Sequence, residues 1–202
     1  PTIPGLLHKN GNTDYVAGKE EYVESVELPA YHLIDIEHYR SENFVAGMIT
    51  SRGCPFECGY CIWGEPDKSL HQFPLDHVLR DIEIVYNHPN VEAVIFTDAC
   101  LFYTRERAKI ICDKIAASAR GKIIPTVLTL DILVVNEEMV TSLSKINLVH
   151  NQLHFGLQTT NPVALEILKR KSGPEIFKKR VDQIRNIDPE AQISFDLIYG
   201  LP

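Results

Sequence analysis

Strand-like and helix-like segments alternate along this chain from residue 44 to residue 199. The strand-like segments are short apolar runs rich in β-branched and aromatic residues, and the helix-like segments have apolar residues at helical spacing. Strict alternation of this kind predicts an α/β fold in which helical crossovers join parallel strands. The expected strands are 44–50, 91–96, 123–130, 148–157 and 192–199, and the expected helices are 74–87, 104–118, 136–146, 162–171 and 174–186.

Five strand–helix steps can build either an open nucleotide-binding sheet or a barrel. No Gly-x-Gly-x-x-Gly turn follows any expected strand, which argues against a dinucleotide-binding sheet. We therefore expect a partial, TIM-like (βα) barrel with parallel strands, preceded by an extended linker over residues 1–43. Parallel barrels carry their chemistry on the loops that follow the strands, at the carboxyl-terminal face.

Three cysteines stand on a short segment directly after the first expected strand. Cys54, Cys58 and Cys61 have the spacing C-x3-C-x2-C, and residues 54–61 are called the cysteine loop below. Three thiolates on one loop can bind three irons of a four-iron cluster and leave the fourth iron open to another ligand. Two other interpretations stay open: a zinc site with a histidine such as His71 as fourth ligand, and buried thiols that bind nothing.

The bulk composition limits the partners and the compartment. The chain has 202 residues, of which 45% are hydrophobic and 23% are charged, and its formal net charge is −7. One substantial core can form, no basic stripe favours a nucleic-acid polymer, and no apolar run is long enough to cross a membrane. Five cysteines with three of them clustered are not typical of a disulfide framework, so we expect a reducing, cytoplasmic compartment.

The cysteine loop resembles the cluster-binding motif of the radical S-adenosylmethionine (SAM) enzymes. The resemblance implies that Cys54, Cys58 and Cys61 bind a [4Fe-4S] cluster whose open iron is chelated by SAM. It also implies that the aromatic Tyr60 lies beside the adenine of SAM. The family uses a partial (βα)6 barrel, and the similarity covers residues 44–202, which is strands one to five. We therefore expect a barrel that is incomplete at its carboxyl terminus, as in a segment of a longer polypeptide.

Three further segments resemble motifs that hold SAM in this family. After the second expected strand, Asp98 stands where the family holds the SAM amino group, although the common Gly-Gly-Glu form is absent. After the fourth, Gln158 and Thr159 are similar to a Gly-x-Glu/Gln-Ser segment that contacts the ribose and methionine moiety. Downstream, Arg170 stands where a basic residue pairs with the SAM carboxylate. Gly200 belongs to a Gly-Leu-Pro signature whose backbone approaches the adenine.

The same residues also have purely structural interpretations. Gln158 and Thr159 could cap the next helix, and Arg170 could be one charge on a solvated basic face. Asp98 could accept a hydrogen bond from a neighbouring loop amide. His154 lies on the fourth expected strand, where we expect it to pack rather than to contact substrate. The sequence leaves these alternatives open.

The linker at residues 1–43 resembles the segment that joins a cobalamin-binding domain to the barrel in B12-dependent radical SAM enzymes. The similarity includes Leu28-Pro29 followed by Tyr31, and Arg52-Gly53 before the first cysteine. It implies a missing amino-terminal domain that binds cobalamin, although no Asp-x-His-x-x-Gly motif occurs in these residues.

Together these resemblances imply an enzyme that cleaves SAM to a 5′-deoxyadenosyl radical. The implied reaction is cobalamin-dependent methylation or rearrangement of a small molecule, with an external electron donor such as a flavodoxin or ferredoxin. One alternative keeps the radical chemistry without cobalamin and modifies a peptide, a cofactor or a nucleoside. Another is a non-enzymatic iron–sulfur electron-transfer module or a zinc module. The sequence assigns neither a catalytic side chain nor a substrate.

Overall fold

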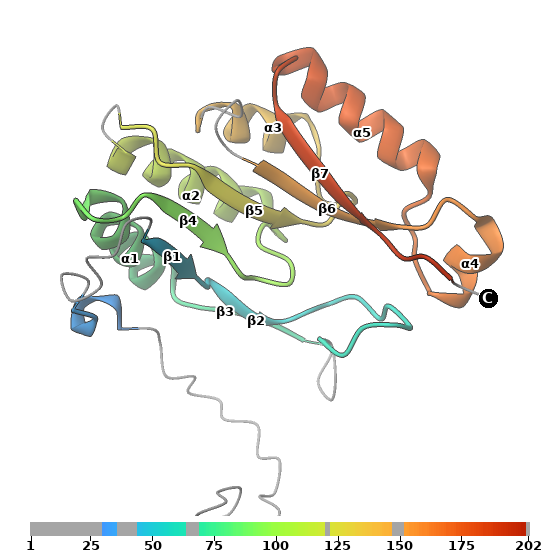
Figure 1. The fold of residues 1–202 in the computed structure, drawn as a ribbon, viewed down its shortest axis with the longest axis horizontal. Coiled ribbons are helices and arrows are strands. Elements are labelled where there is room, and N and C mark those ends of the chain that lie inside the picture. The colour runs from blue at the N-terminus through green and yellow to red at the C-terminus, as the bar shows by residue number, and fades with distance from the viewer. Residues whose placement is uncertain (1–29, 36–43, 64–68, 120–121, 147–151, 201–202) are drawn as a thin grey trace, which may run out of the picture.

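Five parallel strands form the main sheet of this protein. The computed structural model describes residues 30–35, 44–63, 69–119, 122–146 and 152–200. Within them the strand order is β1-β4-β5-β6-β7, with β1 and β7 as the two edges, so the sheet is open and the expected partial barrel is confirmed (Figure 1). The strands are β1 (Val45–Met48), β4 (Ala93–Phe96), β5 (Thr126–Leu130), β6 (Gln152–Gln158) and β7 (Gln192–Leu197).

Helices connect the strands, and most of them cover one face of the sheet (Figure 1). Asparagine side chains begin two of these helices. Asn136 Oδ1 accepts from the Met139 N–H at 3.1 Å, and Asn161 Oδ1 accepts from the N–H groups of Val163 and Ala164 at 2.9 and 3.2 Å. Such caps satisfy amides that have no intrahelical partner. The helices are α1 (Leu75–Asn87), α2 (Arg105–Ala119), α3 (Glu137–Ser144), α4 (Pro162–Ile167) and α5 (Pro174–Ile187).

Alternate strand residues pack under the helices and form the core. Leu128 and Phe155 are fully buried, and the ring of Phe155 meets Phe177 of α5 edge-on at a centroid distance of 5.9 Å. Burial of each such side chain stabilises the fold by about 1.5–3 kcal/mol. The intervening residues face the other, concave side of the sheet. Thr129 and His154 are neighbours in register on that side, so the alternation directs polar side chains into the barrel interior.

The chain does not run straight from the first strand into the cysteine loop, so that expectation is wrong. β1 ends at Met48, and the chain leaves the sheet in an antiparallel hairpin of β2 (Ser51–Gly53) and β3 (Leu70–Gln72). Gly53 has a φ of 80°, and a Cβ there would overlap the carbonyl oxygen of Ser69. Only glycine fits this position, and the hairpin that it permits carries the cysteine loop.

Several elements are shorter than expected, and for two of them the physical reason is visible. The helix expected over 162–171 ends at Ile167, because Lys169 adopts a left-handed φ of 53° and changes the chain direction. The strand expected over 123–130 begins only at Thr126, since a proline in that run lacks the N–H that strand pairing uses.

The described part of the 1–43 segment packs against the barrel. It contains the short 3-10 helix η1 (Tyr31–Leu33), which contacts α1. The buried Tyr31 donates its hydroxyl hydrogen to the Gly47 carbonyl oxygen of β1 at 2.8 Å. Most of the expected linker, and residues 148–151 of the fourth expected strand, lie outside the described residues. In the part of the chain that the structure describes, no helix has the length and hydropathy of a membrane span.

Candidate active site

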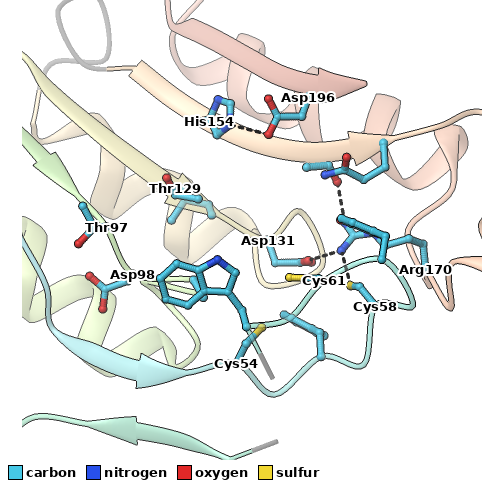
Figure 2. Close-up of a pocket in the computed structure, with 17 residues that line it drawn as sticks. Cys54, Cys58, Cys61, Thr97, Asp98, Thr129, Asp131, His154, Arg170 and Asp196 are labelled. Atoms are coloured by element: carbon cyan, nitrogen blue, oxygen red, sulfur yellow. Dashed lines mark hydrogen bonds and ion pairs between the residues drawn. The ribbon is translucent and has the colours of Figure 1, made fainter. Parts of the chain in front are cut away.

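A pocket of about 360 Å³ opens at the carboxyl ends of the strands, the face where parallel barrels carry their chemistry. Figure 2 shows Cys58 and Cys61 on the side of this pocket where Arg170 lies, with Thr97 and Asp98 across from them. Thr159 and Gly200 lie outside its lining. The lining residues that the sequence singled out are Cys54, Cys58, Tyr60, Cys61, Asp98, His154, Gln158 and Arg170.

The cysteine loop is fastened to the end of α4. The Gly59 N–H donates to the Leu168 carbonyl oxygen at 2.9 Å, an oxygen at the helix end where carbonyls have no intrahelical partner. A Cβ on Gly59 would lie only 3.1 Å from the Ile167 carbonyl oxygen, so glycine permits the close approach. Within the loop, the Cys61 N–H donates to the Cys58 carbonyl oxygen at 3.0 Å. The loop and the end of α4 therefore form one unit.

A Schellman motif at the end of α4 positions Arg170. The Lys169 N–H donates to the Glu166 carbonyl oxygen at 3.0 Å, and the Arg170 N–H donates to the Leu165 carbonyl oxygen at 2.9 Å, which is the bond pair of this motif. Lysine at the left-handed position carries backbone strain that glycine would not. The turn directs Arg170 inward, where its side chain is 8% exposed. The interpretation of Arg170 as a solvated surface charge is therefore wrong.

The Arg170 guanidinium joins the cysteine loop to two strands (Figure 2). Its Nη1 donates to Cys58 Sγ at 3.3 Å and to Asp131 Oδ2 at 3.4 Å. Its Nη2 donates to the Gly156 carbonyl oxygen at 2.6 Å and to Ser172 Oγ at 3.2 Å. Burial pulls the pKa of Arg170 down, but the hydrogen bond to Cys58 and the Asp131 charge outweigh it, so the net shift is upward. These partners stabilise the cation beside the cysteine loop.

The sequence motifs did not single out Asp131, although the structure puts it at the centre of the site. It follows β5 directly, its side chain is 8% exposed, and its Oδ1 accepts from the Leu133 N–H at 2.9 Å. A signal was present, since a carboxylate that directly follows a strand of a parallel barrel stands on the reactive face. Asp131 is the buried counter-charge of Arg170.

The three thiols of the loop differ in their surroundings. Cys54 is buried, whereas Cys58 and Cys61 are half-buried. Burial raises the pKa of the Cys54 thiol above its ordinary value, and the two other cysteines and Asp131 add to the shift. Cys54 therefore binds a metal as a thiolate only if its thiol proton is released when the metal binds. The donor set fits a cluster that takes three protein thiolates, because no other cysteine among the described residues lines this pocket.

The zinc interpretation stays open. In the described part of the chain no three His, Cys, Asp or Glu side chains lie close enough together to hold one metal ion, and zinc would have to draw its ligands to about 2.0–2.3 Å. A four-iron cluster binds each thiolate to a different iron and so keeps the sulfurs further apart. His71 lies in β3, where Ser69 Oγ is hydrogen-bonded to its Nε2, and it does not line the pocket.

Asp98 lines the pocket, but its carboxylate already has partners. It is 2% exposed, and its Oδ1 accepts from Thr50 Oγ1 at 2.8 Å and from Ser51 Oγ at 2.6 Å. The Thr50 N–H lies 3.0 and 3.1 Å from its two oxygens. Burial raises the pKa of Asp98, and these hydrogen bonds oppose the rise. The structural interpretation is therefore confirmed, and contact with the SAM amino group stays a prediction that would use Oδ2.

A bulge at the end of β6 directs Gln158 into the pocket. The pairing with β7 shifts register between Gly156 and Gln158, and Gln158 has a φ of 68°, which residues with side chains rarely adopt. A Cβ on Gly156 would lie 2.5 Å from Gln158 Nε2, so glycine leaves room for the amide. Gln158 does not cap the next helix, because Asn161 does. Thr159 supports that cap, since its Oγ1 accepts from the Asn161 N–H at 3.2 Å.

Tyr60 and Gly200 are the two residues whose predicted partner is the adenine. Tyr60 lines the pocket and is 41% exposed, and burial raises the pKa of its phenol to about 12. Gly200 has a φ of 82°, and a Cβ there would meet nothing within 4 Å. Its backbone conformation, rather than crowding, is what favours glycine. Both adenine contacts stay predictions.

A histidine and a carboxylate face each other across β6 and β7 (Figure 2). His154 Nε2 lies 3.0 Å from Asp196 Oδ2, and His154 Nδ1 lies 2.9 Å from Ser194 Oγ. Both His154 and Asp196 line the pocket. Both ring nitrogens of His154 have partners on β7, which agrees with a structural role, and whether His154 contacts substrate stays untested. The strand pleat turns it to the concave side, where this pair can bind a polar group of a ligand.

An open parallel barrel with a three-cysteine loop at its carboxyl-terminal face is the architecture of the radical SAM class. Residues 48–202 match the sequence profile of the Radical SAM superfamily. The chain belongs to this superfamily.

Curated relatives are identical to the chain at about a quarter of the aligned positions. It is 28% identical, over 99% of its length, to 2-(S-pantetheinyl)-carbapenam-3-carboxylate methyltransferase of Streptantibioticus cattleyicolor. It is 26% identical, over 75% of its length, to tRNA-2-methylthio-N(6)-dimethylallyladenosine synthase of Helicobacter acinonychis. It covers 31% and 36% of these two proteins, so the chain spans about a third of their length.

Solved structures show the same fold. The radical SAM methyltransferase TsrM from Kitasatospora setae superposes with a TM-score of 0.66 at 16% identity, over 83% of this chain and 32% of that one. The cobalamin-dependent radical SAM enzyme OxsB superposes with a TM-score of 0.65 at 14% identity, over 95% of this chain and 29% of that one. At such identities the likeness concerns the fold, and it supports the assignment of a partial barrel.

Proposed function

We propose that this protein binds a [4Fe-4S] cluster through Cys54, Cys58 and Cys61 and cleaves SAM to a 5′-deoxyadenosyl radical that acts on a small molecule. The observation that carries the proposal is a pocket at the carboxyl ends of the strands, which the three cysteines line together with Gln158 and Arg170. When bound, the cluster supplies the electron that breaks a carbon–sulfur bond of SAM. The chain's own side chains bind and orient SAM and substrate and limit access of water.

Arg170 is proposed to pair with the SAM carboxylate, and its present hydrogen bonds indicate which of its donors the carboxylate can use. Its two terminal nitrogens already donate to four acceptors, whereas its buried Nε has no hydrogen-bond partner in the described part of the chain, so the carboxylate either binds Nε or replaces one of the four. The bond to Asp131 is the longest of the three that end on oxygen, at 3.4 Å. If an acceptor is replaced, we expect it to be Asp131, because the buried cation then keeps an anionic partner, while the Leu133 N–H still compensates the Asp131 carboxylate in part.

Cobalamin-dependent methyl transfer is the finer proposal. It is supported by the resemblance of the 1–43 segment to a cobalamin-domain linker and by the likeness of the fold to TsrM and OxsB, both of which have been solved with cobalamin bound. A curated methyltransferase also aligns with nearly the whole chain. We propose that the full-length protein carries an amino-terminal cobalamin domain to which the 1–43 segment is the linker.

A second candidate keeps the radical chemistry and omits cobalamin. Its support is the similarity to tRNA-2-methylthio-N(6)-dimethylallyladenosine synthases, which are 24–26% identical over 75% of the chain. The net charge of −7 gives such a role on a nucleic-acid polymer no electrostatic support. Retained corrin separates the two candidates.

The test is anaerobic reconstitution of the full-length protein with iron, sulfide and hydroxocobalamin, followed by dithionite and SAM. We expect a brown protein that forms 5′-deoxyadenosine and retains corrin. Cys58→Ala should lose both colour and product, whereas Cys112→Ala, in the core of α2, should keep both. Product without corrin favours the second candidate. A cluster without product indicates an electron-transfer module, and a colourless protein that binds zinc overturns the cysteine assignment.

A further inference from the structure

A second pocket, of about 420 Å³, adjoins the first at the cysteine loop. Cys58 is the one cysteine of the loop that lines both pockets, and Asp131 and Arg170 are shared as well. Cys54 and Cys61 line the first pocket alone. The second pocket is lined by Pro55, Phe56, Glu57, Cys58, Asp131, Leu133, Lys169, Arg170 and Lys171.

The rim of this second pocket carries positive charge, although the net charge of the chain is negative. Lys169 and Lys171 are exposed, and neither forms an ion pair within the described part of the chain; we call these two residues the basic rim. Arg170 between them is buried and already paired with Asp131. The rim therefore presents two exposed positive charges beside Glu57, whereas the chain as a whole carries −7. The charge of the two lysines is complementary to that of an acidic partner, whereas the net charge of the chain is not.

The basic rim is mechanically tied to the cysteine loop. The bond from the Gly59 N–H to the Leu168 carbonyl oxygen joins the loop to the residue directly before Lys169. The Schellman bonds hold Lys169 and Arg170 in one turn, and Arg170 Nη1 reaches Cys58 Sγ at 3.3 Å. A partner that contacts the rim is therefore held at a defined position relative to Cys58.

We propose that the second pocket and its basic rim are the docking site of a small acidic one-electron carrier protein, which reduces the cluster by way of Cys58. The inference rests on the proposed function, in which SAM and substrate fill the first pocket. A donor on the second pocket approaches the cluster without competing with them. With a flavodoxin as donor, the hydroquinone anion gives up one electron and becomes the neutral semiquinone. The cluster gains that electron, and no proton moves.

The experiment compares two reductants on the reconstituted full-length protein. The variant Lys169→Glu/Lys171→Glu reverses the basic rim, and Lys122→Glu/Lys179→Glu makes the same change in net charge at exposed lysines outside both pockets. The probes are flavodoxin hydroquinone and photoreduced 5-deazariboflavin, a small uncharged reductant. Stopped-flow bleaching of the cluster gives the reduction rate with each probe.

We expect the rim variant to lower the rate with flavodoxin about tenfold or more at low ionic strength, and the loss to shrink as salt is added. The rate with 5-deazariboflavin and all rates of the control variant should stay at the wild-type level. Equal flavodoxin rates in both variants overturn the docking site, as does an equal slowing with both probes, which would mean that the lysines act on the cluster itself. A protein that 5-deazariboflavin cannot bleach lacks a reducible cluster, and it is then the proposed function that fails.

Discussion

Two arginines are buried in the part of the barrel that the structure describes, and their partners differ in kind. Arg107 of α2 donates from Nη2 to the carbonyl oxygens of Thr50 and Phe73, at 3.2 and 2.9 Å, which lie on either side of the β2–β3 hairpin. Arg170 donates to a cysteine sulfur and a carboxylate as well as to a carbonyl and a hydroxyl. Arg107 therefore holds the base of the hairpin, and Arg170 holds the loop that the hairpin carries.

The pKa values of the two arginines move in opposite directions. Burial lowers the pKa of Arg107, and the charge of Asp98 opposes the shift without cancelling it. At Arg170 the Cys58 and Asp131 partners outweigh burial, and the pKa is raised. An arginine that meets only backbone carbonyls serves the fold, whereas one that is compensated by exchangeable anionic groups is prepared to bind a charged ligand.

The largest effect is expected from Arg170→Met. The change leaves the Asp131 carboxylate buried without a counter-charge, which should cost about 3–5 kcal/mol of unfolding free energy. It should also weaken SAM binding about tenfold or more, since a hydrogen bond to a charged group contributes about 1.5–3 kcal/mol. Guanidinium denaturation followed by circular dichroism and equilibrium binding of SAM measure the two quantities. Adding Asp131→Asn to this variant should restore part of the stability; no recovery would mean that the pair is not coupled.

The second largest effect is expected from Arg107→Met, which tests the comparison of Arg107 with Arg170. The buried Phe73 carbonyl oxygen loses the Arg107 donor, whereas the Thr50 carbonyl oxygen keeps the hydrogen bond from the Phe73 N–H, so the expected cost is about 1–3 kcal/mol. SAM affinity of the folded protein should stay unchanged, because Arg107 lies outside the pocket lining. The matched control is Arg105→Met on the same helix, whose side chain is 62% exposed; its stability should stay within about 0.5 kcal/mol. Equal losses of SAM affinity in Arg107→Met and Arg170→Met would break the distinction between the two arginines.

A smaller effect is expected from Gly59→Ala, which acts on the attachment of the loop to α4. The new Cβ would lie 3.1 Å from the Ile167 carbonyl oxygen, and the required shift should cost about 1 kcal/mol. Because Arg170 and Cys58 lie on opposite sides of this contact, iron retention after reconstitution should fall as well. Gly47→Ala is the control, since a Cβ there meets nothing within 4 Å. A Gly59→Ala protein with wild-type stability and iron content would show that the contact is dispensable.

The smallest effect, and the one of opposite sign, is expected from Lys169→Gly. Glycine relieves the strain of a left-handed residue at φ 53° but loses more backbone entropy on folding, so the net gain should be about 0.5 kcal/mol. Thermal unfolding measures it. Lys171→Gly removes the same charge at a position without positive φ and should bring no gain. Equal stabilisation by both would attribute the effect to charge instead of to the turn that positions Arg170.

The fold was largely predictable because its signals are local. Composition and hydrophobic period predict each strand of the sheet and each helix between the strands. Because strands and helices alternate and no dinucleotide-binding turn is present, a parallel barrel is the simplest arrangement. The β2–β3 hairpin was not predictable in this way. Its strands are three residues long. It depends on two residues that lie far along the chain: Asp98 accepts from the Thr50 N–H, and Arg107 donates to the Thr50 carbonyl oxygen.

The site divides along the same line. The cysteine spacing and the likeness of the Asp98, Gln158 and Arg170 segments to family motifs are properties of the sequence by itself, because a loop that follows a barrel strand must open at one face. Only the tertiary structure decided that Arg170 points inward and that Asp131 is its partner. Both depend on one left-handed residue and on contacts across more than thirty positions of the chain, since neither a φ angle nor the position of a buried counter-charge is encoded in local residue spacing.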